Sequence, residues 1–261
     1  RVVQTPGFIA GDFHVHSFDS PDASVTRTER VATLLAEGMD FFTPSDHDFR
    51  ADFQPTLNAM GVTSLISTAP SAEITTFDYG HFISWPVTVD PSAVNGGGVD
   101  FGRAGVAPGM DFPSLGSYSL SPAEIFVTAR ADPKANLVQI NHVHSFFGKD
   151  GLDIDTAEGG IGPPTSHTPP LSRRLDPAVP NFFDAGFDAL EVWIGTDGRN
   201  GDLNQFLGLN LGDWVNLLNQ GIRRSGVADS DTHNRRSTKL GTRSFVASAV
   251  TDPGLLGPEA E

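Results

Sequence analysis

Residues 26–48, TRTERVATLLAEGMDFFTPSDHD, hold the signals for a helix, a turn and a strand in one short stretch. Thr26 with Glu29 three positions later forms a capping box, which predicts a helix start, and apolar residues at helical spacing follow. Gly38 predicts the helix end. The apolar run after it predicts a buried strand that delivers polar residues 45–48 at its carboxyl end. A helix leading into such a strand is the repeating unit of an α/β fold.

The same alternation continues along the rest of the chain, and Ser121, Pro122 and Glu124 repeat the helix-start signals. Polar residues again gather where apolar runs end. This pattern predicts a parallel α/β barrel or sheet with its site at the carboxyl ends of the strands. The other expected elements are helices over about 50–60 and 203–220, and strands at 12–15, 63–67, 71–75, 79–87, 136–144, 187–195, 223–233 and 243–250.

The length and composition favour one compact unit. The chain has 261 residues, of which 38% are hydrophobic, so we expect a single domain over residues 1–261. Two stretches rich in Gly and Pro, at about 90–118 and 145–180, interrupt the alternation. Loops of this length in a compact domain usually cover a site or bind something, so we expect them to roof the pocket.

The charge and the missing cysteine exclude several classes of function. A net charge of −15 and the lack of any Lys/Arg run disfavour nucleic-acid binding. Bound divalent cations would offset this charge locally and attract a small anionic substrate. Without cysteine there is no disulfide, no thiolate metal ligand and no cysteine nucleophile.

No apolar run approaches the roughly 20 residues that a membrane span needs, so we expect a soluble protein without membrane insertion. Residues 1–11 lack the charged and apolar regions of a signal peptide. The chain begins with Arg, which agrees with excision from a longer or exported protein. The compartment and the oligomeric state stay open.

Seven of the eight histidines fall where apolar runs end. His14 and His16 are two residues apart on an expected strand, so both side chains lie on one face. Imidazoles with carboxylates and no sulfur suit Zn, Fe or Mn, and a carboxylate between two ions lets them share a hydroxide. The sequence therefore predicts a multinuclear metal site. Its candidate residues are His14, His16, Asp22, His47, Glu73, His81, His142, His144, Asp231 and His233.

These residues resemble the polymerase and histidinol phosphatase (PHP) family in type and order. That family has an HxH motif, a (T/S)DH motif, a Glu, further single histidines and a terminal DxH. The segments SAEITTFDYGHF (71–82) and DALEVWIG (188–195) are similar to its carbaryl-hydrolase branch. The resemblance spans most of the chain. The matching residues are His14 and His16, Ser45-Asp46-His47, Glu73, His81, His142, and Asp231-Thr232-His233.

The resemblance implies a distorted (β/α)7 barrel that binds two or three divalent ions at the carboxyl ends of its strands. Its first motif region is one residue longer here, so Asp19 competes with Asp22 as a ligand. By similarity, the first ion would be held by His14, His16, Glu73 and Asp231, the second by Glu73, His81 and His142, and the third by His47, His233 and Asp22.

Further roles are expected around the ions. Asp46 and Glu191 are candidates for orienting ligand imidazoles. His144 is a ligand, a substrate contact or a loop residue. Arg243 is the candidate for binding a substrate anion, with Arg235 and Arg173 as alternatives. The direct catalytic roles fall to Glu73, Asp231 and His233.

The expected activity is metal-dependent hydrolysis of a small phosphomonoester by a hydroxide that bridges two ions. A carboxylic or carbamate ester is the alternative substrate. A urease-like amidohydrolase barrel also opens with HxH, but it needs a bridging carboxylated Lys or Glu and ends with a lone Asp. A non-catalytic metal-binding module of a larger protein is the alternative to an enzyme.

Overall fold

The computed structural model describes residues 5–76, 79–103, 119–135, 137–142, 184–195, 202–219, 221–235 and 242–256. The strands are β1 (Phe8–Val15), β2 (Phe41–Pro44), β3 (Ser67–Thr68), β4 (Ala72–Thr75), β5 (His81–Trp85), β6 (Leu137–Ile140), β7 (Ala189–Ile194), β8 (Ser225–Asp229) and β9 (Ser244–Ala247). The α-helices are α1 (Arg27–Glu37), α2 (Gln54–Met60), α3 (Pro122–Arg130) and α4 (Asp202–Asn219), and two short 3-10 helices are η1 (Val94–Gly96) and η6 (Pro253–Leu255).

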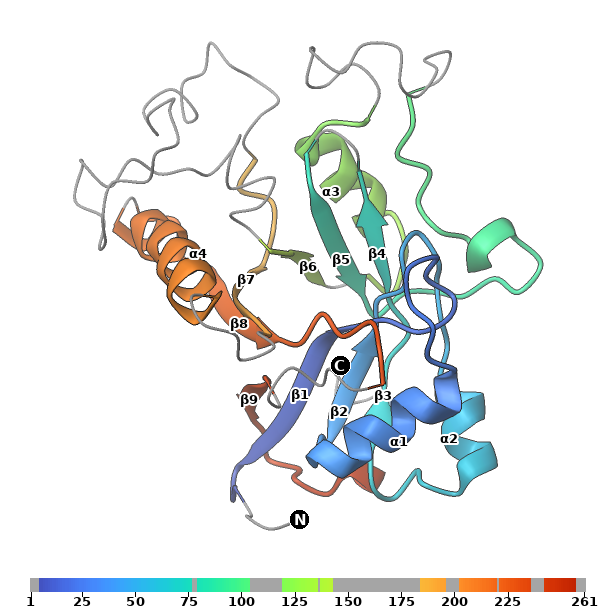
Figure 1. Cartoon of the computed structure of the whole chain (residues 1–261). Helices are drawn as coiled ribbons and strands as arrows, with labels where there is room; N and C mark the ends of the chain where they lie inside the picture. Colours follow the sequence, from blue (N-terminus) through green and yellow to red (C-terminus); the bar gives the residue numbers. More distant parts are fainter. Residues whose placement is uncertain are drawn as a thin grey trace.

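The described strands form two sheets. The first has the order β3-β2-β1-β9, in which β1, β2 and β3 are parallel and β9 is antiparallel to β1. The second has the order β4-β5-β6-β7-β8, in which β6, β7 and β8 are parallel and β5 is antiparallel to both its neighbours. Figure 1 shows α1 and α2 beside the first sheet, and α3 and α4 beside the second.

The expected (β/α)7 barrel is not what the structure has, because the two sheets do not close into one ring. Strands β3, β4 and β5 follow one another with no α-helix between them, and β4 pairs with β5 as an antiparallel hairpin. Such a short connection cannot join parallel strands, so the alternation of strand and helix breaks here. The fold is a mixed α/β fold, as the sequence predicts, with two sheets.

Helix α1 begins and ends where the sequence predicts. The Thr26 side chain accepts a hydrogen bond from the Glu29 N–H, and the Glu29 side chain accepts one from the Thr26 N–H. Gly38 ends the helix in the left-handed conformation, with φ at 75°. Buried Val31 packs in one core with Phe42 of β2. This core attaches α1 to the first sheet.

The second sheet has its own apolar core. Ile125 and Phe126 of α3 and Leu217 of α4 are buried together with Phe82 of β5 and Ile140 of β6. Helix α3 starts with the predicted capping box, and α4 falls within one residue of the predicted 203–220. Among the described helices, none is long and apolar enough to cross a membrane.

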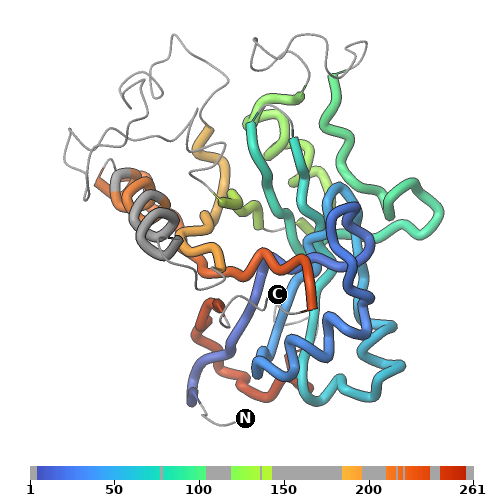
Figure 2. The backbone as a smooth tube through the Cα atoms, in the orientation of Figure 1, coloured from blue at the N-terminus to red at the C-terminus, as the bar shows by residue number. Residues whose placement is uncertain are grey.

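The two sheets meet where β1 and the segment after β8 run side by side. The Ser230 N–H donates to the Asp12 carboxylate at 3.0 Å, and the Asp231 N–H donates to the His14 carbonyl at 2.9 Å. An isolated parallel bridge joins β1 to Thr232 just beyond. Figure 2 shows this segment, in orange-red, passing the end of β1. The carboxyl ends of both strands therefore lie together.

Part of the first long stretch, residues 90–103, is described, whereas 104–118 and 145–180 lie outside the described residues. A Cβ on Gly98 would lie only 2.2 Å from the Asp48 carbonyl oxygen, so this position requires glycine. The start of the stretch thus packs against the loop after β2. That it roofs a pocket stays a prediction.

Candidate metal centre

The candidate ligands meet at the junction of the two sheets. In four groups of three, single donor atoms lie within 4.8 Å of one another, and these groups share members. Most of the ligands lie at the carboxyl end of a strand or in the loop after it, but Glu73 lies inside β4 and His81 is the first residue of antiparallel β5. The members of these groups are His14, His16, His47, Glu73, His81, His142, Asp231 and His233. Asp22 is outside the groups but contacts His47 and His233.

Glu191 of β7 orients His14. The fully buried carboxylate of Glu191 lies 3.0 Å from Nδ1 of His14 and accepts its proton. Its other oxygen accepts the His142 N–H at 2.5 Å. One carboxylate therefore sets the tautomer of His14 and the backbone position of a second candidate ligand, the role that the sequence predicts for it.

Ser20 and Asp46 orient His16 in the same way. The Ser20 hydroxyl donates to the Asp46 carboxylate at 3.0 Å. It must therefore accept from His16 Nδ1, 2.9 Å away. The same oxygen also accepts the His47 N–H at 2.9 Å. Asp46 acts on His16 through this serine, and Nε2 of His16 is left with a lone pair.

The donor set fits a bound cation. With both Nδ1 atoms protonated, the Nε2 lone pairs of His14 and His16 face each other at 3.0 Å. The carboxylate of Asp231 lies 3.4 Å and 3.3 Å from these two nitrogens. Glu73 Oε1 lies 3.2 Å from His14 Nε2. Lone pairs and carboxylate oxygens that converge in this way require a positive charge among them.

The pKa values of the buried histidine rings also indicate that a positive charge is favoured here. Burial alone would lower the pKa of His14, but Asp231, Glu73 and Glu191 raise it well above its ordinary value. Burial lowers the pKa of neighbouring His16 to about 3. The carboxylates around His14 thus favour a positive charge at this position, which a bound metal ion would supply.

Glu73 lies between separate groups of imidazoles. Its Oε1 is 3.3 Å from His81 Nδ1 and 3.5 Å from His142 Nε2, whereas its Oε2 is 2.7 Å from His47 Nδ1. Asn141 donates to Oε1 at 2.6 Å. Burial would raise the pKa of Glu73, yet His14 and His81 lower it well below its ordinary value. An ionised, fully buried carboxylate in contact with several imidazoles has the placement of a bridging ligand.

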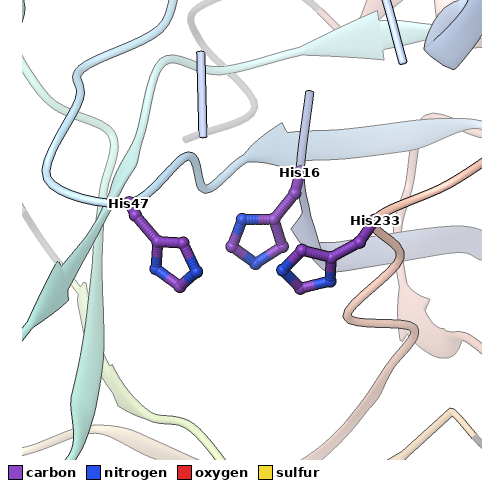
Figure 3. A group of neighbouring side chains, drawn as sticks. All are labelled: His16, His47 and His233. Carbon is purple, nitrogen blue, oxygen red and sulfur yellow. The ribbon is translucent and has the colours of Figure 1, made fainter. Parts of the chain in front are cut away.

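His16, His47 and His233 form a further group at the more exposed side. Figure 3 shows their rings next to one another, carried by three different segments of the chain. Asp22, with a side chain 53% exposed, lies 3.3 Å from His47 Nε2 and 3.1 Å from His233 Nε2. Its rival Asp19 instead pairs with Arg27 at 2.8 Å. The geometry favours Asp22 over Asp19.

Arg243, the predicted anion-binding residue, lies elsewhere. It donates to the Glu37 carbonyl at 2.8 Å, at the carboxyl end of α1, where a cation stabilises the helix end. The alternative Arg235 pairs with Glu29 at the other end of that helix. Both arginines therefore contact α1 in this structure, and anion binding by Arg243 stays a prediction. His144 and Arg173 lie outside the described residues.

Two residues of the centre were missed by the sequence reasoning. Ser20 lies in the loop between the first motif and α1, and Asn141 directly precedes His142. Their only signal was proximity to the motifs, since serine and asparagine are common in any loop. Two ligand positions also have unusual backbone conformations, with φ at 28° for His142 and 48° for Asp231. Such strain is typical of sites where geometry serves function.

Replacing Glu191 with Gln is expected to weaken metal binding by about 10- to 100-fold, because the amide no longer draws the proton to Nδ1 of His14. Equilibrium dialysis against Zn²⁺ and Mn²⁺ measures this change. Glu37→Gln, an isosteric change near the end of α1, is the matched control and should bind as the wild type does. Equal dissociation constants for all three proteins would contradict the orienting role.

Comparison with known proteins gave no matching family model and no matching curated protein by sequence. Among solved structures, one similar protein is a two-domain protein from Bacteroides vulgatus containing a predicted PHP-like metal-dependent phosphoesterase, with a TM-score of 0.46, 16% identity, and coverage of 92% of this chain and 57% of that one. Another is a candidate metal-dependent phosphoesterase from Bifidobacterium adolescentis, with a TM-score of 0.44, 15% identity, and coverage of 94% and 93%. The chain thus spans little more than half of the first protein's length.

Proposed function

We propose that this chain is a metal-dependent hydrolase of the PHP type that cleaves small phosphomonoesters. The observation that carries the proposal is Glu73, a buried carboxylate whose two oxygens face different groups of imidazoles. A carboxylate in this position lets two ions act on one ester. The proposal rests on this geometry and on the order of the motifs, and it does not depend on the two structural neighbours.

Two or three divalent ions, Zn, Mn or Fe, are the proposed cofactors. When bound, they supply an activated water and polarise the acceptor oxygen of the ester. His14, His16 and Asp231, with Glu73, would hold the first. Glu73 would be shared with a second, held by His81 together with His142 or His47, and His47, His233 and Asp22 would hold a third.

The exposed side of the centre is where a substrate would approach. The side chains of Asp231 and His233 are 17% and 26% exposed, whereas Glu73 is fully buried. Asp231 and His233 are therefore the ligands proposed to act next to the substrate, whereas buried Glu73 acts through the ions. Glu73 is proposed to stay ionised during the reaction and to fix the positions of the ions that it binds.

The charge of the chain favours a small substrate. At a net charge of −15, the surface outside the centre repels a polyanion that must track across it. A phosphomonoester presents one compact dianionic group, which the bound ions alone can neutralise. We therefore propose a small anionic ester as substrate and no nucleic-acid partner.

A steady-state panel tests the substrate class. The metal-loaded protein is assayed with phosphomonoesters, carboxylic and carbamate esters, and single-stranded DNA, and chelated protein serves as the control. We expect phosphomonoester turnover in the loaded protein only. Efficient DNA cleavage would overturn the substrate class, ester turnover without phosphatase activity would favour the carboxylic or carbamate alternative, and metal binding without any turnover would favour a non-catalytic module.

A further inference from the structure

Arg30, near the start of α1, is a fully buried arginine, and the free-energy cost of burying its charge needs an explanation. Its Nε donates to the His16 carbonyl at 2.7 Å. Its Nη2 and Nη1 donate to the carbonyl and the hydroxyl of Thr232 at 2.9 Å and 3.1 Å. Burying a guanidinium costs desolvation free energy that an apolar side chain on this helix would avoid. Packing alone therefore does not account for an arginine here.

The oxygens that Arg30 binds belong to two of the backbone segments that carry candidate ligands. His16 is itself a candidate ligand at the end of β1, and Thr232 lies between Asp231 and His233. The Thr232 carbonyl also accepts the His16 N–H at 3.1 Å. Arg30 thus completes a hydrogen-bonded unit that contains one segment from each sheet.

We infer that Arg30 is a positioning residue of the metal centre, which sets the spacing between the end of β1 and the loop after β8. This spacing decides whether His16 and Asp231 converge, with 3.3 Å between Nε2 and Oδ1 in the structure. The planar fork of arginine offers donors in fixed directions to oxygens on two segments, whereas lysine offers one nitrogen. The inference rests on the proposed metal binding.

The test compares Arg30→Lys with Arg27→Lys, a matched change on the same helix. Arg27 binds Asp19 at 2.8 Å and the Asp52 carbonyl at 3.0 Å, and neither is a proposed ligand. The two variants and the wild type are loaded with Co²⁺, and the visible d–d spectrum and the dissociation constant are measured well below the melting temperature. We expect Arg30→Lys to change the spectrum and weaken binding at least about tenfold, and Arg27→Lys to match the wild type.

A merely structural role would lower the melting temperature but leave the spectrum of the folded protein unchanged, so an unchanged spectrum and affinity in Arg30→Lys overturn the inference. If Arg30→Lys does not fold, Thr232→Val decides in its place, because it removes one acceptor of Arg30 and keeps the side-chain shape. A wild-type spectrum in Thr232→Val then overturns the inference. If the wild type binds no Co²⁺, Zn²⁺ or Mn²⁺, the proposed function fails first and the positioning role with it.

Discussion

Glu73→Gln is expected to lower turnover by about three powers of ten, equivalent to about 4 kcal/mol of activation free energy. Gln keeps the shape of the side chain but removes the negative charge that His14, His47, His81 and His142 surround. Two cations would then repel each other with no anion between them. Metal analysis of the purified variant should show fewer bound ions than in the wild type.

The control for this variant is again Glu37→Gln, which removes a carboxylate at the end of α1, far along the helix from the candidate ligands. Turnover and metal content should stay within about twofold of the wild type, the range of an ordinary surface change. Circular dichroism of both variants checks that the fold is intact. Near-normal turnover and metal content in a folded Glu73→Gln protein would exclude the bridging role.

Removing the metal ions is expected to destabilise the folded protein strongly. Ions that bind only the folded state contribute about 4 kcal/mol each when present at a thousandfold excess over their dissociation constant. Without them, the carboxylates of Glu73, Asp231 and Glu191 remain close together with fewer cations to balance them. Urea unfolding with and without a chelator should show this loss, together with loss of hydrolysis.

The same measurement with metal-saturated chelator separates ion removal from any effect of the chelator itself. Adding back Zn²⁺ or Mn²⁺ should restore both the free energy of unfolding and the activity. If the chelated protein keeps its urea midpoint while metal analysis shows it to be empty, the ions are not part of the folded structure.

Local features of this fold follow from the sequence because their contacts are local. The capping box of α1 joins Thr26 to Glu29, and Gly38 needs only its own backbone freedom to end the helix. The set of candidate ligands could also be predicted, since residue type decides which side chains bind a cation. Of the nine predicted ligands, eight fall within the groups of converging donors. The ninth, Asp22, contacts two of those eight, His47 and His233.

The orienting carboxylates Asp46 and Glu191 could be predicted as candidates, but the imidazole that each one serves could not, because this pairing joins residues distant in the sequence. Glu191 lies 177 positions from His14, the imidazole whose proton it accepts. Ser20 is close to His16 in the sequence, but it orients that ring through Asp46, 26 positions away, and Asn141 donates to Glu73 from 68 positions away. A sequence motif can suggest an orienting carboxylate, but it does not say which ring that carboxylate contacts.

Residue type and short spacing predict helices α1, α3 and α4 and the kinds of side chain in the candidate site, because these features depend on near neighbours in the chain. The strand expected at 63–67 is instead a turn that leads into the short strand β3. Long-range packing divides the strands into two sheets, places Asp22 rather than Asp19 beside the histidines, and brings Arg243 to the end of α1. These outcomes are set by competition among long-range partners. A carboxylate or guanidinium goes to whichever partner the fold places nearest, and spacing along the chain does not record that distance.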